Sequence, residues 1–304
     1  QMAPAADYLF ISIETLVNGI SIAIMIPCVI TLIRTQVIHD NCKVLLVTSA
    51  SAQTLLLISQ MSLFANNYIT ENLLPKSQQR SPFIMMQYIC FIMSSQMSMV
   101  IVLERAYAVW KAAEYEKVNR HLVSLLILIG STLIMSLLHV YAINWHDWLY
   151  ESIILLYAIE GSTLIISIVL IIYARRKIRV LPYDGDRLRA KYQVREVLDF
   201  PIAILPSIIL SAIMHTLSLV PTILLSNDLV TYPVSSVFYF SIHSLNCIFT
   251  KLALIACHKG MRERFQRMIF RVRCDSRKAA RIEIDAEKEG KEHFEQMRAA
   301  WDGP

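Results

Sequence analysis

Residues 152–174 read SIILLYAIEGSTLIISIVLIIYA, a run of 23 residues in which Glu160 is the only charged residue. An α-helix rises about 1.5 Å per residue, so a helix of this length crosses the roughly 30 Å hydrocarbon core of a bilayer. The strands of a membrane barrel would be shorter and would alternate apolar with polar residues. The run therefore predicts a transmembrane helix.

Six further apolar runs have the same character, and all seven hold 21 to 26 residues. They cover residues 8–33, 44–64, 81–103, 122–143, 200–225 and 234–257. The chain is 55% hydrophobic and only 17% charged, which leaves too little polar surface to cover the cores of soluble domains of 304 residues. We predict an all-α membrane protein, a seven-transmembrane helix bundle that occupies residues 1–273 together with a short segment after the last span.

The distribution of Lys and Arg predicts the orientation, because these residues resist transfer across a membrane. Counted to Arg277, 21 of them fall on one side of the seven spans, and only Lys76 and Arg80 fall on the other. The N-terminus is therefore expected outside the cell. Insect-type odorant-gated channels have the opposite orientation, and sugar transporters of the three-plus-one-plus-three type have repeated halves that this sequence lacks. A receptor is favoured, with a seven-helix ligand-gated channel or transporter as the alternative.

The segment after the last span has its own pattern. In residues 258–273, Met261, Phe265 and Met268 recur at helical spacing between arginines, which predicts an amphipathic helix on the inner leaflet. Residues 274–304 are a charged cytoplasmic tail. Cys257 and Cys274 flank the helix, either as palmitoylation sites or, by default, as free thiols. No cysteine falls in a predicted outer loop, so no extracellular disulfide framework is implied.

The cytoplasmic side carries candidate coupling residues. Glu104 and Arg105 end the third span, and we expect Arg105 at the water interface. In heptahelical receptors such an acid-Arg pair can hold the inactive state and then release the arginine toward a G protein; the other interpretation is a simple interfacial charge pair. The basic segment 175–195 is read as a G-protein docking surface, as a site of attraction to anionic lipid, or as a topology signal, and these readings are compatible.

Two sequence patterns on this side resemble a known family. The residues after span three, Glu104, Arg105, Ala108, Tyr115-Glu116-Lys117 and Arg120, resemble nematode serpentine chemoreceptors of the Sre type. Residues 191–196, KYQVRE, are similar to the basic-aromatic-Gln-x-x-Glu motif of the wider Sra superfamily, although Val197 stands where the family usually has Asn. With the seven spans, the resemblance covers residues 8 to about 273.

The resemblance implies a G-protein-coupled chemosensory receptor. Its partners would be a small-molecule ligand, a heterotrimeric G protein and the lipid bilayer, and its place the plasma membrane of a sensory neuron, including the ciliary membrane. The candidate coupling residues are Glu104, Arg105, Arg175, Arg176, Lys177, Lys191, Tyr192, Gln193 and Glu196. The characteristic motifs of rhodopsin-like receptors in spans two, four, six and seven are missing, so their activation switches cannot be transferred to this chain.

Polar residues inside the spans are the candidate ligand contacts, because they are costly in lipid and normally face the bundle. Those expected in the outer halves are Glu14, Gln87, Tyr88, Glu160, His215, Tyr239 and His243. The other interpretation is that each only bonds a neighbouring helix. Glu160 is the first choice as a ligand contact. Its partner is expected to be a histidine such as His215, a hydroxyl such as that of Tyr239, or the ligand.

Two further patterns bear on other functions. Lys251 lies six residues before Cys257, too near the cytoplasmic end for the retinal linkage of opsins, so we expect its side chain to reach the inner surface. The sequence has no phosphate-binding glycine loop and no His-Glu-x-x-His pair. We therefore predict no enzyme activity, no cofactor or metal site, and no nucleic-acid partner.

Overall fold

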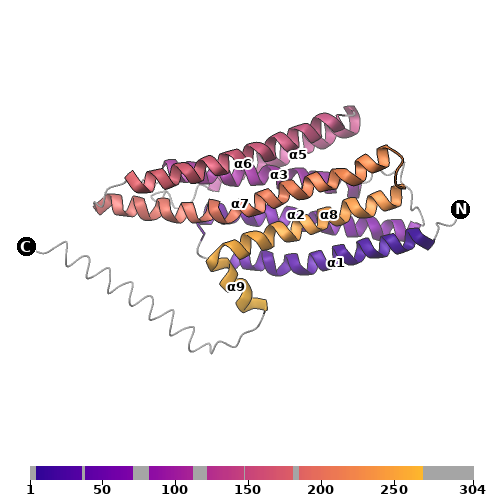
Figure 1. Cartoon of the computed structure of the whole chain (residues 1–304), viewed down its shortest axis with the longest axis horizontal. Helices are drawn as coiled ribbons and strands as arrows, with labels where there is room; N and C mark the ends of the chain where they lie inside the picture. Colours follow the sequence, from indigo (N-terminus) through magenta and orange to yellow (C-terminus); the bar gives the residue numbers. More distant parts are fainter. Residues whose placement is uncertain are drawn as a thin grey trace, which may run out of the picture. The chain divides into compact units, whose positions relative to one another are not determined.

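The computed structural model describes residues 5–35, 38–70, 82–111, 122–146, 148–180 and 185–269. Within these ranges the regular structure is helical and no strand is present, which confirms the predicted all-α class. The described helices are α1 (Ala5–Arg34), α2 (Asp40–Thr70), α3 (Pro82–Trp110), α5 (Leu122–His146), α6 (Leu149–Val180), α7 (Gly185–Ser226), α8 (Tyr232–Cys257) and α9 (Lys259–Ile269). The long helices α1 to α8 lie side by side in one bundle (Figure 1).

Seven of the described helices, α1 to α8, are long and apolar enough to cross a membrane, and each overlaps one predicted run. Several helices extend beyond these runs. α6 continues to Val180 and α7 begins at Gly185, so the basic segment between spans five and six is largely helical. Residues 181–184, between these two helices, lie outside the described residues.

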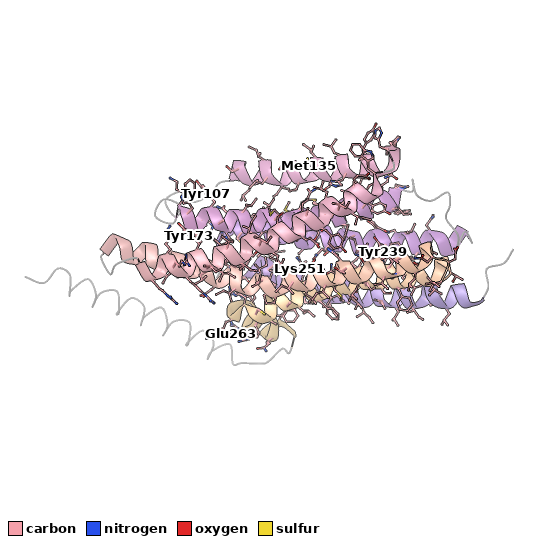
Figure 2. All side chains as sticks on the ribbon, turned by 45° about the horizontal axis from the view of Figure 1, so that its top comes forward. Tyr107, Met135, Tyr173, Tyr239, Lys251 and Glu263 are labelled. Atoms are coloured by element: carbon pink, nitrogen blue, oxygen red, sulfur yellow. The ribbon has the colours of Figure 1, made fainter. Side chains whose placement is uncertain are left out.

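The outer surface of the bundle is apolar, and its interior holds polar residues beside an apolar core. Ile154 is 69% exposed and Ile127 65%, whereas Ser136 and Ser167 are fully buried. Met135 and Tyr173, labelled in Figure 2, are both about half exposed. Because water would disfavour such a surface, the burial pattern independently supports helices that lipid surrounds.

The helices pack so that α3 lies at the centre. It contacts α2, α5, α6 and α7, while α8 packs against α7 and α1 and so closes the bundle. A buried polar network fastens the closure, since Asn18 Nδ2 of α1 donates to the carbonyl oxygen of Leu57 at 2.8 Å. The hydroxyl of Ser244 on α8 lies 3.3 Å from both Asn18 Oδ1 and Gln60 Oε1. Such hydrogen bonds hold helices together where lipid supplies no hydrophobic driving force.

α7 carries three prolines within its 42 residues, Pro201, Pro206 and Pro221. Each lacks the N–H that would bond to the carbonyl four residues earlier, and each crowds that carbonyl. Prolines are the commonest cause of bends in long helices. α7 is therefore the helix of this bundle with the most interruptions in its backbone hydrogen bonding.

α8 ends at Cys257, and the extended backbone of His258 separates it from α9. The side chain of Met261 is fully buried in the apolar core cluster of the bundle, and Phe265 packs against that cluster. Gln1–Phe265 form one compact unit and a second begins at Gln266, whose described part is the last turn of α9. The amphipathic helix predicted over 258–273 is thus helical through Ile269. Its remaining residues and the tail 274–304 lie outside the described residues.

Candidate functional site

A cavity of about 270 Å³ opens among α3, α5, α6, α7 and α8, near the ends where α6 begins and α7 finishes. Seven of its lining residues carry aromatic or histidine rings, and five of these rings contact one another. The ring of Phe91 lies 4.9 Å from those of His215 and His243, and the ring of Tyr239 lies 4.5 Å from His243. We call this space the aromatic cavity; its rings are Tyr88, Phe91, Tyr157, Tyr239, Phe240 and His243, with His215 beside them.

Five of the seven predicted ligand residues line the aromatic cavity. They are Tyr88, Glu160, His215, Tyr239 and His243, which come from four different helices. Gln87 and Glu14 are buried elsewhere, and Gln87 Nε2 and Glu14 Oε1 have no hydrogen-bond partner within the described part of the chain. The structure therefore gathers most of the predicted residues in one place, and their role in binding a ligand stays a prediction.

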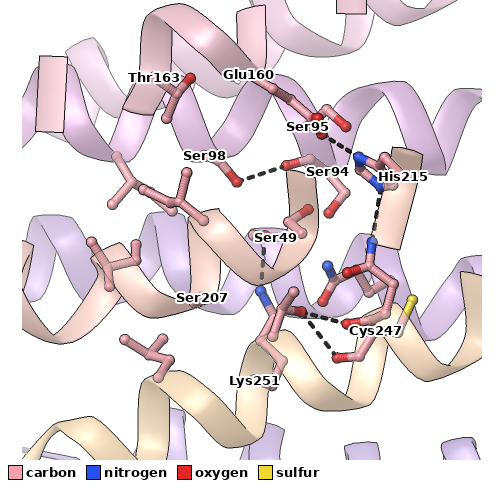
Figure 3. A pocket seen from close by; sticks show the side chains of 18 of the residues that line it. Ser49, Ser94, Ser95, Ser98, Glu160, Thr163, Ser207, His215, Cys247 and Lys251 are labelled. Atoms are coloured by element: carbon pink, nitrogen blue, oxygen red, sulfur yellow. Dashed lines mark hydrogen bonds and ion pairs between the residues drawn. The ribbon is translucent and has the colours of Figure 1, made fainter. Parts of the chain in front are cut away.

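A chain of hydrogen bonds runs across one wall of this cavity. His215 Nδ1 of α7 contacts Glu160 Oε1 of α6, and Asn246 Nδ2 of α8 lies 2.8 Å from His215 Nε2 (Figure 3). The amide Nδ2 can only donate, so Nε2 of the ring accepts in this contact. His215 thus joins three helices.

A second, smaller cavity of about 50 Å³ adjoins the first and shares Glu160, His215 and His243 with it. We call it the serine cavity, after its lining residues Ser49, Ser94, Ser95, Ser98, Ser207 and Ser211. Ser98, Thr163 and Thr250 donate to carbonyls of their own helices, as buried helical hydroxyls usually do. The hydroxyls of Ser94, Ser95, Ser207 and Ser211 bond to no residue in the described ranges. They are available to water, and the cavity has room for one or two molecules at about 30 Å³ each.

Lys251 lies inside the bundle, which corrects the expectation that it reaches the inner surface. Its side chain is only 6% exposed and lines the serine cavity, where Nζ is 3.3 Å from the hydroxyl of Ser49 (Figures 2 and 3). No carboxylate within the described residues forms an ion pair with it. The physical reason is that polar residues of α2, α3 and α7 line the serine cavity, which gives the Lys251 side chain polar surroundings inside the bundle.

The Glu104–Arg105 pair lies at the opposite end of α3. The guanidinium of Arg105 contacts the Glu104 carboxylate twice, through Nε at 2.5 Å and a terminal nitrogen at 2.6 Å. Arg105 is only 3% exposed, so the expectation of a position at the water interface is wrong. α3 continues five residues beyond it to Trp110, and α2 begins at Asp40 alongside, which places Arg105 more than a turn inside the helix end.

Lys177 joins the same end of α3 to α6. Its ammonium donates to the carbonyl oxygen of Val109 at 2.7 Å and to that of Trp110 at 3.2 Å. The last carbonyls of a helix lack partners within the helix, and a cation there also favours the helix dipole. Lys177, predicted as a coupling residue, is therefore engaged in holding two helices together in this conformation.

The comparison with known families decides the identity. Residues 2–302 match the family described as Sre G protein-coupled chemoreceptor. The chain belongs to the Sre chemoreceptor family. No curated protein matches this Sre receptor.

Family membership confirms several predictions made for the Sre receptor. The resemblance to Sre-type receptors of the Sra superfamily is correct, and the protein is a multi-pass membrane protein of a G-protein-coupled chemosensory class. The family is one of chemoreceptors and not of enzymes. Its ligand, its G protein and the membrane in which it resides stay proposals.

The remaining predicted residues of the Sre receptor are distributed as follows. Arg175 and Arg176 are exposed on α6, beside Lys177. Lys191, Tyr192, Gln193 and Glu196 belong to the helical backbone of α7, but their side chains lie outside the described residues. Cys257 is an exposed free thiol at the end of α8, and Cys274 is outside the described residues. Coupling and acylation stay predictions.

Sequence reasoning missed Asn246 and Phe91 as parts of the Sre receptor's site. Asn246 carries the far end of the hydrogen-bond chain, and Phe91 packs its ring against both histidines. A signal for Asn246 exists in the sequence, because it follows His243 by three residues and so shares a helix face with it. Phe91 gives no such signal, since an apolar ring in an apolar span looks the same whether it faces lipid or a cavity.

Proposed function

We propose that this Sre-family receptor recognises a small molecule in the aromatic cavity and activates a heterotrimeric G protein from the end of the bundle that carries Glu104 and Arg105. The observation that carries the proposal is the convergence of Tyr88, Glu160, His215, Tyr239 and His243 on one cavity. Small-molecule sites are typically concave and mostly apolar, with a few polar groups that fix the orientation of the ligand.

The contact between Glu160 and His215 offers a route from the cavity to the cytoplasm. It ties α6 to α7, and α7 continues from His215 to Gly185 at the other end of the bundle. A ligand that binds better when these helices are separated would shift the population toward that arrangement. The helix ends beside Glu104 and Arg105 would then offer a different surface to the G protein.

The charge distribution supports an extracellular N-terminus, which places the aromatic cavity on the outer side and the Glu104–Arg105 pair in the cytoplasm. This orientation suits a receptor that samples external chemicals. The proposed location is the plasma membrane of a sensory neuron, with the ciliary membrane as its specialised part.

The proposal is tested by expressing the receptor with a promiscuous G protein and screening small molecules with a calcium readout. For an agonist found in this way, Glu160→Gln should raise the half-maximal dose about tenfold, equivalent to about 1.4 kcal/mol, with little change in surface expression. Ser162→Ala, an exposed position on the same helix, is the matched control.

Two results would contradict the proposal. One is an unchanged dose for Glu160→Gln together with an unchanged dose when Leu156→Trp fills the aromatic cavity. The other is ligand-dependent ion current or solute flux from purified receptor in liposomes that contain no G protein, because only a channel or transporter predicts transport.

A further inference from the structure

We infer that the aromatic cavity takes a small protonated amine, whose ammonium group binds Glu160 and lies against the surrounding rings. This inference rests on the proposed function, since it names the class of ligand for that cavity. It is carried by the acidic side chain in the cavity, by the aromatic rings that line it and by its size.

Among the described residues that line the cavity, Glu160 is the only acid, and none is a lysine or an arginine. Its protein partner is the ring of His215, which contacts Oε1 through Nδ1. A carboxylate in the membrane interior is costly without a counter-ion, and the ammonium group of a ligand can supply one.

The carboxylate of Glu160 also has a second oxygen that a ligand can contact. Oε1 accepts from His215, whereas Oε2 makes no hydrogen bond to a described residue and is not sealed off by protein. A carboxylate accepts through both oxygens, so a ligand N–H can bind Oε2 without displacing His215. Lys251, which lines the adjoining serine cavity, forms no ion pair with Glu160.

The aromatic rings of the cavity also favour a positively charged ligand. Tyr88, Phe91, Tyr157 and Tyr239 line the cavity together with Glu160. The faces of aromatic rings attract cations, by about 0.5–1 kcal/mol at exposed sites and more where water is excluded. An anionic ligand would meet repulsion from Glu160 and from the ring faces. A neutral ligand of the same shape would gain only the apolar contacts.

The volume limits the size of the amine, and one orphan atom offers a second contact. About 270 Å³ is the space of about nine water molecules and lies just below the range of about 300–1,000 Å³ typical of drug-sized pockets. His243 Nε2 is buried in the wall without a hydrogen-bond partner in the described ranges. A small monoamine, with or without a second polar group for His243, fits this space, and a peptide does not.

Three probes that share one carbon skeleton test the inference: cyclohexylmethylamine, cyclohexylmethanol and cyclohexanecarboxylate. Each is titrated against the full-length receptor in lipid nanodiscs, with the rise in unfolding temperature as the measure of binding. The variants are Glu160→Gln, the charge-retaining Glu160→Asp, and Leu156→Trp, which fills the aromatic cavity. Leu219→Trp, at another lining position on α7, replaces the filling variant if that one does not fold.

The amine should bind at least tenfold more tightly than the alcohol, and the acid should not bind. Glu160→Gln should remove this preference while leaving the alcohol unchanged, Glu160→Asp should keep part of it, and the filling variant should abolish binding of both. Equal binding of amine and alcohol, blocked by the filling variant, would overturn the amine class and leave the proposed cavity standing. Binding that the filling variant does not affect would overturn the cavity and the amine together. Failure of all three probes to bind folded receptor would overturn the amine class. The agonist screen described above would still test whether the aromatic cavity is the ligand site.

Discussion

The ammonium of Lys177 donates a hydrogen bond to the carbonyl oxygen of Val109, one residue before α3 ends. This contact closes the helix end that carries Glu104 and Arg105 against α6. Since the terminal carbonyls of α3 have no partners within their own helix, Lys177 satisfies groups that would otherwise turn to water.

Lys177→Met should loosen the cytoplasmic end of the bundle. Methionine keeps the aliphatic stem but loses the charged donor, so unfolding should become easier by about 1 kcal/mol. Ligand-independent signalling should rise, because α6 is no longer held to α3. The measurements are the unfolding temperature in nanodiscs and basal G-protein activity. Arg176→Met, at an exposed neighbouring position, is the control, and equal effects of the two variants would show that only net charge matters.

Removing Arg105 alone should impair folding, because its guanidinium is buried against Glu104. Breaking one side of a buried ion pair typically costs about 3–5 kcal/mol, whereas replacing both partners costs far less. We expect Arg105→Gln to lower surface expression and Glu104→Gln/Arg105→Gln to recover much of it.

Neither of these two variants should activate a G protein if Arg105 is the coupling residue. Expression is read by surface labelling and signalling per surface receptor by calcium release. Normal signalling by the folded double variant would leave the pair with a structural role only.

Lys251→Met should leave the unfolding temperature unchanged or higher. The buried ammonium has one 3.3 Å contact with a hydroxyl, and replacing a poorly paired buried charge by an apolar side chain of similar shape is often neutral or stabilising. Signalling should weaken, because polar groups kept inside a membrane protein usually serve its function. Lys259→Met, at an exposed position, is the control. A loss above about 2 kcal/mol would instead mean that water or an ion completes the shell of the ammonium.

The orientation can be tested without a ligand. An epitope tag placed before Tyr8 should be reached by antibody on intact cells, and a tag after Pro304 only after permeabilisation. The reason is the concentration of Lys and Arg on one side of the seven spans. Reversed staining would exclude the receptor function and move the aromatic cavity to the cytoplasmic side.

The fold was predictable because length and apolar composition alone decide whether a helix crosses a membrane. Part of the site was predictable for a related reason, since polar residues in a span must face protein. On α8, His243, Asn246, Thr250 and Lys251 recur at helical spacing and form one buried polar face. Recognising that stripe in the sequence would have placed Lys251 inside the bundle.

Other features depend on distances that no spacing encodes. The pairing of Glu160 with His215 was one of several expected partners, and only the packing of α6 on α7 selects it. The burial of Arg105 depends on how far α2 and α3 extend beyond their apolar runs. A charged residue near a helix end looks interfacial in the sequence, whether or not a neighbouring helix covers it.

The prolines of α7 allow this helix to bend, so that a movement on one side of a proline causes a movement on the other side. Pro206 lies 21 residues from Gly185, where α7 begins, a distance of about 32 Å along a helix. A bend of about 10° at Pro206 would carry that end sideways by about 5 Å, roughly half the width of a helix. His215 lies on the short arm, between Pro206 and Pro221. A ligand that moves His215, nine residues from Pro206, would therefore move the far end of α7 about twice as far, because the arm from Pro206 to Gly185 is about twice as long.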